Sequence, residues 1–174
     1  MIPLDLILAG LSVGAIVKSY HTSRLLDKSL ISTNFGCYNR AGAEIKGNEF
    51  IRKERRKVAS GELVMVACDI AGMGKLNTLK GELWVNRAIA ACISDIRLWR
   101  GVRFISQINS GDEFAIVVDK IDAAGLLHRI DDLFQAEGFT GVYGVIVPLK
   151  DCYINSANQG MQEVYQLKQL VSHK

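Results

Sequence analysis

The chain has 174 residues and a formal charge of +3, with 49% hydrophobic and 22% charged residues and only 2 prolines. This length and composition suit one folded domain with its own core, and they exclude a disordered or fibrous chain. A charge of +3 does not predict a DNA- or RNA-binding protein, because such proteins concentrate basic residues along one face. Small anionic ligands are still compatible with it.

The cysteines and histidines argue against a zinc site. No CxxC pair occurs, and the histidines are isolated from one another and from the cysteines, so no tetrahedral ligand set can be built. Most of the cysteines lie in apolar surroundings, which is typical of buried free thiols and favours a reducing, cytoplasmic location. They are Cys37, Cys68, Cys92 and Cys152. Any metal is therefore expected to be held by oxygen.

The amino-terminal stretch at residues 2–17 is apolar, with Asp5 as its single charged residue. It is short for a membrane span, which needs about 20 apolar residues. Lys18, Arg24 and Lys28 follow it, and by the positive-inside rule they predict that the rest of the chain lies in the cytoplasm. Two interpretations stay open: a hydrophobic helix packed on the domain or on a second copy, and a tether on the cytoplasmic face of the inner membrane.

The first half of the remaining chain alternates helix and strand. Residues 39–59 predict a mostly solvated helix, because a few apolar positions recur among many charges. Residues 62–70 (ELVMVACDI) are a continuous apolar run that reaches Asp69, which predicts a central strand covered on both faces. A glycine-containing connection at 71–81 follows. Residues 82–99 then predict a helix, because apolar side chains repeat at helical spacing.

The second half begins with a hairpin. Residues 102–109 and 113–118 predict two strands joined by a short turn around residues 110–111. A helix, a strand and an amphipathic helix follow at 120–138, 141–148 and 156–170. An antiparallel hairpin within a βαββαβ order predicts an α+β fold with helices outside the sheet.

Three acidic residues are expected to meet at one edge of this sheet. Asp69 ends the central strand, while Asp112 and Glu113 open the second strand of the hairpin. A single Asp at the end of a strand usually belongs to a turn. Three acids beside a glycine-containing connection instead predict a site for a divalent cation, Mg²⁺ or Mn²⁺, which prefers carboxylate and phosphate oxygens.

The connection after Asp69 is a candidate phosphate-binding segment. Its residues are Gly72, Met73, Gly74 and Lys75. The glycines leave backbone N–H groups unobstructed, and the segment leads into the start of a helix, where anions are favoured. It is not a Walker loop, because Asp69 stands at the position of the first glycine and Leu76 at that of the Ser or Thr.

Four short motifs occur along the chain: FGCYNR at 35–40, CDIAGMGKLN at 68–77, SGDEF at 110–114 and NQGMQEVYQLK at 158–168. In order and separation they resemble the motifs of the GGDEF domains of diguanylate cyclases, over about residues 32–172. The resemblance implies a palm-like GGDEF domain at 32–174, and residues 1–31 would then be an N-terminal hydrophobic helix and linker.

The resemblance also implies an activity. Each subunit of a homodimer would hold one nucleoside triphosphate, GTP or alternatively ATP, and the two would condense into a cyclic dinucleotide with release of pyrophosphate. Asp69 and Asp112 would bind Mg²⁺ through their side chains and Ile70 through its backbone carbonyl, while Glu113 would support catalysis. No DNA or RNA partner is implied.

Further residues are implied in nucleotide binding. The backbone of Gly72, Met73 and Gly74 would donate to the phosphates. Asn77 corresponds to an asparagine that contacts guanine, and Lys168 corresponds to a lysine that reaches the terminal phosphate.

The sequence departs from the family pattern at specific positions. Ser110 replaces the first glycine of the GGDEF motif. Met73 and Gly74 stand where the family has phenylalanine and lysine, and Lys75 is displaced by one position. The acid that helps to read guanine falls at Asn86, whose amide can match the adenine edge with both of its groups.

These departures leave three functions in competition. They are an active GGDEF-type cyclase, a degenerate module that binds nucleotide or a partner without catalysis, and a related cyclase with relaxed or adenine base preference. The family's product-inhibition motif, RxxD, would begin at Gly101 and end at Phe104. We therefore expect no high-affinity product binding at that surface.

Overall fold

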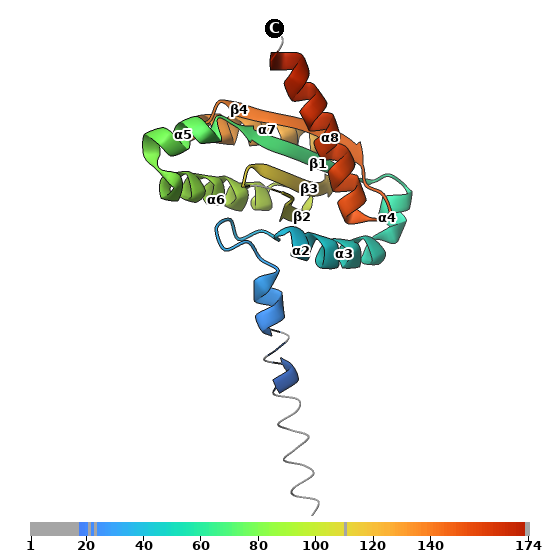
Figure 1. The fold of residues 1–174 in the computed structure, drawn as a ribbon. Coiled ribbons are helices and arrows are strands. Elements are labelled where there is room, and N and C mark those ends of the chain that lie inside the picture. The colour runs from blue at the N-terminus through green and yellow to red at the C-terminus, as the bar shows by residue number, and fades with distance from the viewer. Residues whose placement is uncertain (1–17, 21, 23, 110, 173–174) are drawn as a thin grey trace, which may run out of the picture.

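The computed structural model describes residues 18–20, 22, 24–109 and 111–172 (Figure 1). The apolar stretch at 2–17 and the first motif residue, Ser110, lie outside this part of the chain. Within it, no helix is both long enough and apolar enough to cross a bilayer. Residues 24–29 are helical and stand away from the sheet, ahead of the domain.

The centre of the domain is a sheet of four antiparallel strands in the order β2-β3-β1-β4. The strands are β1 (Leu63–Ala71), β2 (Val102–Gln107), β3 (Glu113–Asp119) and β4 (Gly141–Pro148). The expected hairpin is confirmed, because β2 pairs with β3 and Ile108 N–H donates to the carbonyl of Glu113 at 2.9 Å. The register places Asp69 directly opposite Glu113.

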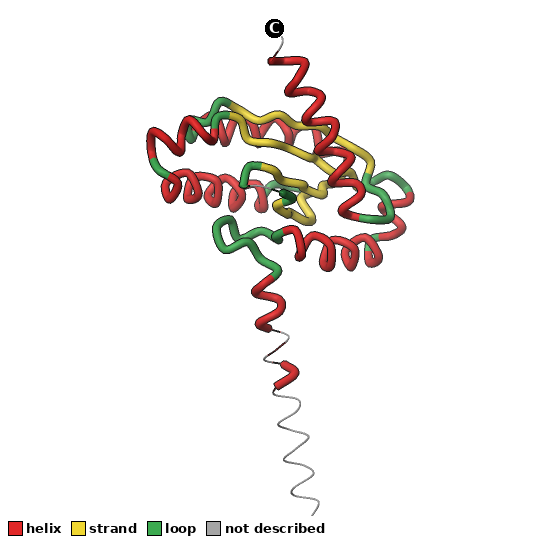
Figure 2. Tube along the Cα trace, viewed as in Figure 1, coloured by secondary structure: helices red, strands yellow, loops and turns green. Residues whose placement is uncertain are grey.

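Helices cover both faces of this sheet (Figure 2). One face packs against α5 (Met73–Lys80), α6 (Glu82–Leu98) and α7 (Ala123–Ala136). The other packs against η1 (Ala43–Gly47), α3 (Asn48–Lys53) and α8 (Tyr153–Ser172). The short elements α2 (Arg40–Gly42), α4 (Arg55–Ala59) and η2 (Lys120–Asp122) complete the set. The observed order confirms the predicted α+β fold with a βαββαβ arrangement.

The alternation along β1 explains its continuous apolar run. Val66 and Cys68 belong to the core on the α6 and α7 side, whereas Met65 and Ala67 belong to the core on the α8 side. Successive side chains of a strand point to opposite faces, so Asp69 lies on the α8 side with Met65 and Ala67. The same alternation on β3 puts Glu113 on that side.

Two predictions of local structure differ from the observed chain. The expected glycine connection at 71–81 is mostly helical, because residues 73–80 form α5. The expected helix at 39–59 is divided into α2, η1, α3 and α4, with a break at Glu54, whose φ of −98° and ψ of 17° are not helical. Its charged positions are largely exposed, as predicted.

Candidate functional site

The acid cluster consists of Asp69, Asp112 and Glu113, and each of them offers a carboxylate oxygen within 4.8 Å of the others. Asp69 is 3% exposed and Glu113 is 6% exposed, while Asp112 is half-buried in the turn. The turn is fixed beside β1 by the N–H of Ile70, which donates to the carbonyl of Asp112 at 2.9 Å. The predicted convergence of the three acids is therefore confirmed.

Asp69 is held by a lysine from α8. Both of its carboxylate oxygens accept from Nζ of Lys168 at 2.9 Å. Burial raises the pKa of Asp69 above its usual value, and the bond to Lys168 acts in the opposite direction. The same ammonium lies 5.8 Å from the ring centre of Tyr143, the residue that pairs with Asp69 on β4.

Glu113 is held by neutral donors instead. The hydroxyl of Tyr165 donates to Oε1, and Nδ2 of Asn109 donates to Oε2 at 2.5 Å. Asn109 is positioned in turn by Arg40, whose Nη1 donates to its Oδ1 at 2.6 Å. The bond to Glu113 is the main cause that raises the pKa of Tyr165 to about 12, so this hydroxyl stays protonated at neutral pH.

Sequence reasoning did not assign a role to Tyr165, Asn109 or Arg40. Arg40 and Tyr165 lie inside motifs that carry the family resemblance, and Asn109 directly precedes SGDEF. The spacing of Tyr165 and Lys168 was a usable signal, because residues three apart share one face of a helix.

The start of α5 is the predicted phosphate segment. Gly72 caps the helix with a φ of 88°, and a Cβ there would lie 2.4 Å from Oγ1 of Thr140, so only glycine fits. The N–H of Leu76 donates the first backbone hydrogen bond of the helix, to the carbonyl of Gly72 at 3.1 Å. The N–H groups of residues 73–75 therefore precede it at the helix N-terminus, where anions are favoured.

The two asparagines expected to contact the base lie on neighbouring helices. Asn77 is on α5 and Asn86 on α6, and both are half-buried. Oδ1 of Asn77 is fully buried and has no hydrogen-bond partner among the described residues. A buried acceptor of this kind calls for a donor, which a bound nucleobase could supply.

Comparison with solved structures identifies the fold. A microbial GGDEF domain solved with cyclic di-GMP aligns with a TM-score of 0.67 at 18% identity, over 83% of this chain and 93% of that one. The coiled coil and GGDEF domain of DgcB from Caulobacter crescentus, solved with c-di-GMP, also gives 0.67, at 14% identity and with 95% and 94% covered. This chain has the GGDEF-domain fold. The diguanylate cyclase SiaD from Pseudomonas aeruginosa, in complex with its activator SiaC, aligns with a TM-score of 0.56 at 15% identity, over 93% of this chain and 70% of that one.

Sequence comparison alone does not give this result. No protein-family model matches the chain, and no curated protein matches it. The predicted resemblance to GGDEF domains is confirmed through the fold, at identities of 14–18%.

The acid cluster of this GGDEF fold suits a hard divalent cation. It offers carboxylate oxygens from three residues within a short distance of one another, and no histidine or cysteine belongs to it. Oxygen ligands of this kind are those that Mg²⁺ and Mn²⁺ prefer. The residues present therefore fit the predicted metal.

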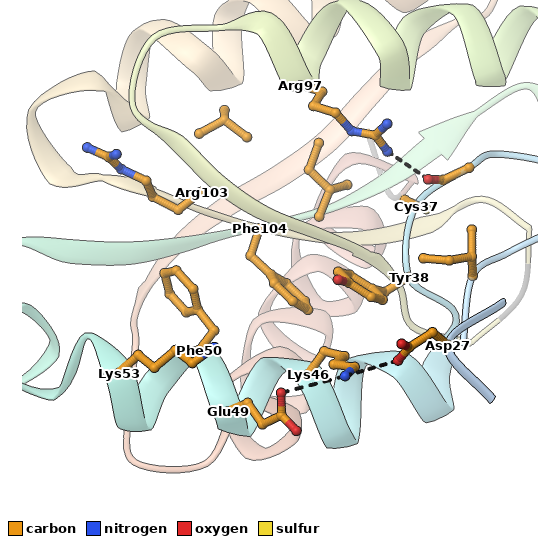
Figure 3. Close-up of a pocket in the computed structure, with 14 residues that line it drawn as sticks. Asp27, Cys37, Tyr38, Lys46, Glu49, Phe50, Lys53, Arg97, Arg103 and Phe104 are labelled. Carbon is orange, nitrogen blue, oxygen red and sulfur yellow. Dashed lines mark hydrogen bonds and ion pairs between the residues drawn. The ribbon is translucent and has the colours of Figure 1, made fainter. Parts of the chain in front are cut away.

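A large cavity lies elsewhere in the domain, along the outer edge of β2 (Figure 3). This β2-edge cavity has a volume of about 810 Å³ and contains none of the three acids. Tyr38 stacks on Phe104 inside it, with ring centres 4.7 Å apart. Lys46 pairs with Asp27 at 3.1 Å, and Arg97 donates to the carbonyl of residue 36 at 2.7 Å.

The arginines near the expected RxxD position are engaged by acids of the same chain. Arg100 pairs with Asp122 at 3.3 Å, and Arg103 donates to both carboxylate oxygens of Asp119. A ligand at this surface would have to compete with these pairs, which favours the prediction that product does not bind there tightly.

Proposed function

We propose that this protein is a diguanylate cyclase-like nucleotidyl transferase that condenses two nucleoside triphosphates, GTP or alternatively ATP, into a cyclic dinucleotide. The observation that carries the proposal is the convergence of Asp69, Asp112 and Glu113 at the hairpin turn of a GGDEF fold. SiaD, which shares this fold, is a diguanylate cyclase. That activity is proposed for this chain because it retains the acids that the chemistry requires.

The acid cluster would hold a divalent cation through Asp69 and Asp112, with the Ile70 carbonyl as a further oxygen. When bound, Mg²⁺ or Mn²⁺ neutralises charge that develops on the phosphate oxygens. In the reaction the 3′-oxygen of one nucleotide forms a bond to the α-phosphorus of the other, and the bond to pyrophosphate breaks. Glu113, which Tyr165 and Asn109 hold, would accept the proton of the 3′-hydroxyl.

The nucleotide would lie across the start of α5. The N–H groups of Gly72, Met73, Gly74 and Lys75 would donate to the phosphates, and the buried Oδ1 of Asn77 would accept from the base. Each chain offers one such set of groups, whereas the product needs two nucleotides. The proposed catalyst is therefore a homodimer in which two acid clusters face each other.

A second candidate is a module that binds nucleotide without catalysis. It is favoured by Gly74, where the family has a lysine, and by Asn86, where it has an acid. Cyclic di-GMP is bound by two of the GGDEF structures that share this fold. In this case the same groups would bind a nucleotide, but no cyclic product would form.

One experiment separates the two candidates. The purified full-length protein is incubated with MgCl₂ and each of the four nucleoside triphosphates, and products are identified by mass spectrometry, with Asp112→Asn as the matched control. A cyclic dinucleotide formed by the wild type and not by the variant supports the cyclase. Mg²⁺-dependent nucleotide binding without product supports the binding module. If the protein neither forms a product nor binds nucleotide, both candidates are rejected.

A further inference from the structure

Helix α8 contacts both buried acids of the cluster through one face. Lys168 bonds Asp69, and Tyr165, one turn earlier, bonds Glu113. Asp69 and Glu113 are direct partners in the β1–β3 register and lie on the face of the sheet that α8 covers. One helix therefore supplies a partner to each of two facing carboxylates.

The position of α8 is fixed by its first half. A Cβ on Gly160 would lie 2.5 Å from Cβ of Ala67, so the glycine allows α8 to approach β1 closely. Met161 and Val164 are buried beside it, whereas residues 165–171 are half-buried or exposed. This packing sets the reach of Tyr165 and Lys168 towards the acids and makes their contacts a built feature of the fold.

The two partners differ in kind. Tyr165 presents a neutral hydroxyl on a rigid aromatic side chain. Lys168 presents a full positive charge on a flexible stem whose side chain is 38% exposed. Because its ammonium bonds both oxygens of Asp69, it occupies the two atoms through which that carboxylate would bind a divalent ion. Two cations on one buried carboxylate repel each other strongly.

We infer that Lys168 is a resident counter-cation of Asp69, which a divalent ion must displace in order to bind, while Tyr165 keeps Glu113 in place. The inference rests on the metal site of the proposed function. Displacement transfers Lys168 from the carboxylate to the mouth of the site, where a triphosphate supplies negative charge. Metal and nucleotide then favour each other's binding. The metal ion releases Lys168 from Asp69, and the triphosphate provides a new partner for the released ammonium.

The test measures metal affinity without nucleotide. Mn²⁺ alone is titrated into the full-length protein at pH 8, and free Mn²⁺ is followed by electron paramagnetic resonance. Lys168→Gln keeps an N–H donor towards Asp69 but removes the charge, and it is expected to bind Mn²⁺ about tenfold more tightly or better. Lys168→Arg keeps the charge and should bind close to the wild-type level.

A matched control is Lys46→Met, which also removes one positive charge and one lysine–carboxylate pair, at the β2-edge cavity. Its Mn²⁺ affinity should equal that of the wild type. A second readout follows the wild-type side chain directly. The ¹⁵Nζ resonance of Lys168, assigned by its loss in Lys168→Gln, should shift when Mg²⁺ is added to the wild type.

Each result decides the inference. Tighter binding in Lys168→Gln alone, together with the shift of the wild-type resonance, supports it. Unchanged or weaker binding in that variant, an equal gain in Lys46→Met, or a resonance unmoved by saturating Mg²⁺ would overturn it. Because no nucleotide is present, a failure here is distinct from a failure of the proposed activity, which is read from product formation.

Discussion

At the acid cluster, three carboxylates gather at the turn of the β2–β3 hairpin, and two of them, Asp69 and Glu113, are buried. Their negative charges therefore lie close together. The β2-edge cavity lies towards the other end of the hairpin (Figure 3). Three of its positive groups are engaged by acids or a carbonyl of the same chain: Lys46, Arg97 and Arg103. Asp69 and Asp119 illustrate the contrast. Each is paired with a basic side chain, Lys168 or Arg103, yet Asp69 is buried and Asp119 is only half-buried.

The comparison distinguishes two kinds of charged group. Those of the acid cluster are expected to bind a ligand, whereas those at the β2-edge cavity are neutralised by partners within the fold. Burying like charges together costs stability, and a fold that retains such a cluster is expected to use it. Exposed pairs such as Arg103 with Asp119 contribute little and need no function. The size of a cavity is therefore a poorer guide to the site here than the burial of its charges.

The largest expected effect comes from Asp112→Asn, because the amide is nearly isosteric with the carboxylate but cannot neutralise a divalent ion. We expect Mg²⁺-dependent affinity for GTP to fall about 100-fold or more, with the fold intact. Fluorescence titration with a labelled GTP measures it, and circular dichroism checks the fold. Asp119→Asn, at the opposite end of the hairpin, should leave affinity unchanged. Equal affinity in wild type and Asp112→Asn would remove the acid cluster from the binding site.

Asn86→Asp tests whether the acid cluster has a base site beside it. A carboxylate accepts from both N1–H and the exocyclic amine of guanine, and leaving such a donor pair poorly matched costs about 1–3 kcal/mol. We expect wild-type discrimination between GTP and ATP to be relaxed or inverted, and the variant to gain about tenfold in favour of GTP. Competition binding of the two nucleotides gives both ratios. Strong GTP preference in the wild type with no gain in the variant would show that Asn86 does not contact the base.

Tyr165→Phe removes only the hydroxyl that holds Glu113. Because the ring remains, we expect product formation to slow about tenfold, mainly through kcat, with little change in KM. Steady-state kinetics of both proteins measures this division. Tyr38→Phe at the β2-edge cavity keeps the stack on Phe104 and should leave the rate unchanged. An effect confined to KM would contradict a positioning role for Tyr165.

The smallest expected effect concerns stability and pH. Since burial raises the pKa of Asp69 in the folded chain, its contribution to stability is present below the unfolded pKa and is lost as pH rises through the folded one. Asp69→Asn should therefore unfold with a free energy higher by about 1 kcal/mol at pH 7, and this gain should vanish towards pH 4. Urea unfolding across this range checks it. Asp119→Asn should show no such gain, and a variant less stable than wild type at pH 7 would contradict the sign.

Much of the sheet could be predicted from the sequence. The apolar run before Asp69 and the short turn before Glu113 indicated the strands, and their ends fixed where the acids would meet. Helix α5 could not be predicted in this way, because residues 73–80 carry no clear apolar face and are bounded by glycines. A helix of this length is stabilised by its packing and its Gly72 cap rather than by its own pattern.

The supporting residues of the site were also beyond sequence reasoning. Arg40, Asn109 and Tyr165 come from three separate parts of the chain. The β2–β3 turn brings Asn109 to Glu113, the packing of α8 brings Tyr165 to it, and Arg40 of α2 reaches Asn109. Residue type alone does not distinguish them from the many other polar side chains of the surface.

The segment before α2 closes the open edge of the sheet. Tyr38 bridges Ile31 on one side and Ser106 of β2 on the other, and its backbone exchanges bonds of 3.2 and 2.8 Å with Ile105 and Gln107. A chain shortened to begin at Arg40 would lose this segment. The backbone groups of β2 that bond Tyr38 would then face water beside Phe104. Bare strand edges pair with other chains, so the shortened protein would aggregate during expression even though every residue of the acid cluster is retained. Any fragment prepared for assay should therefore start upstream of Ile31.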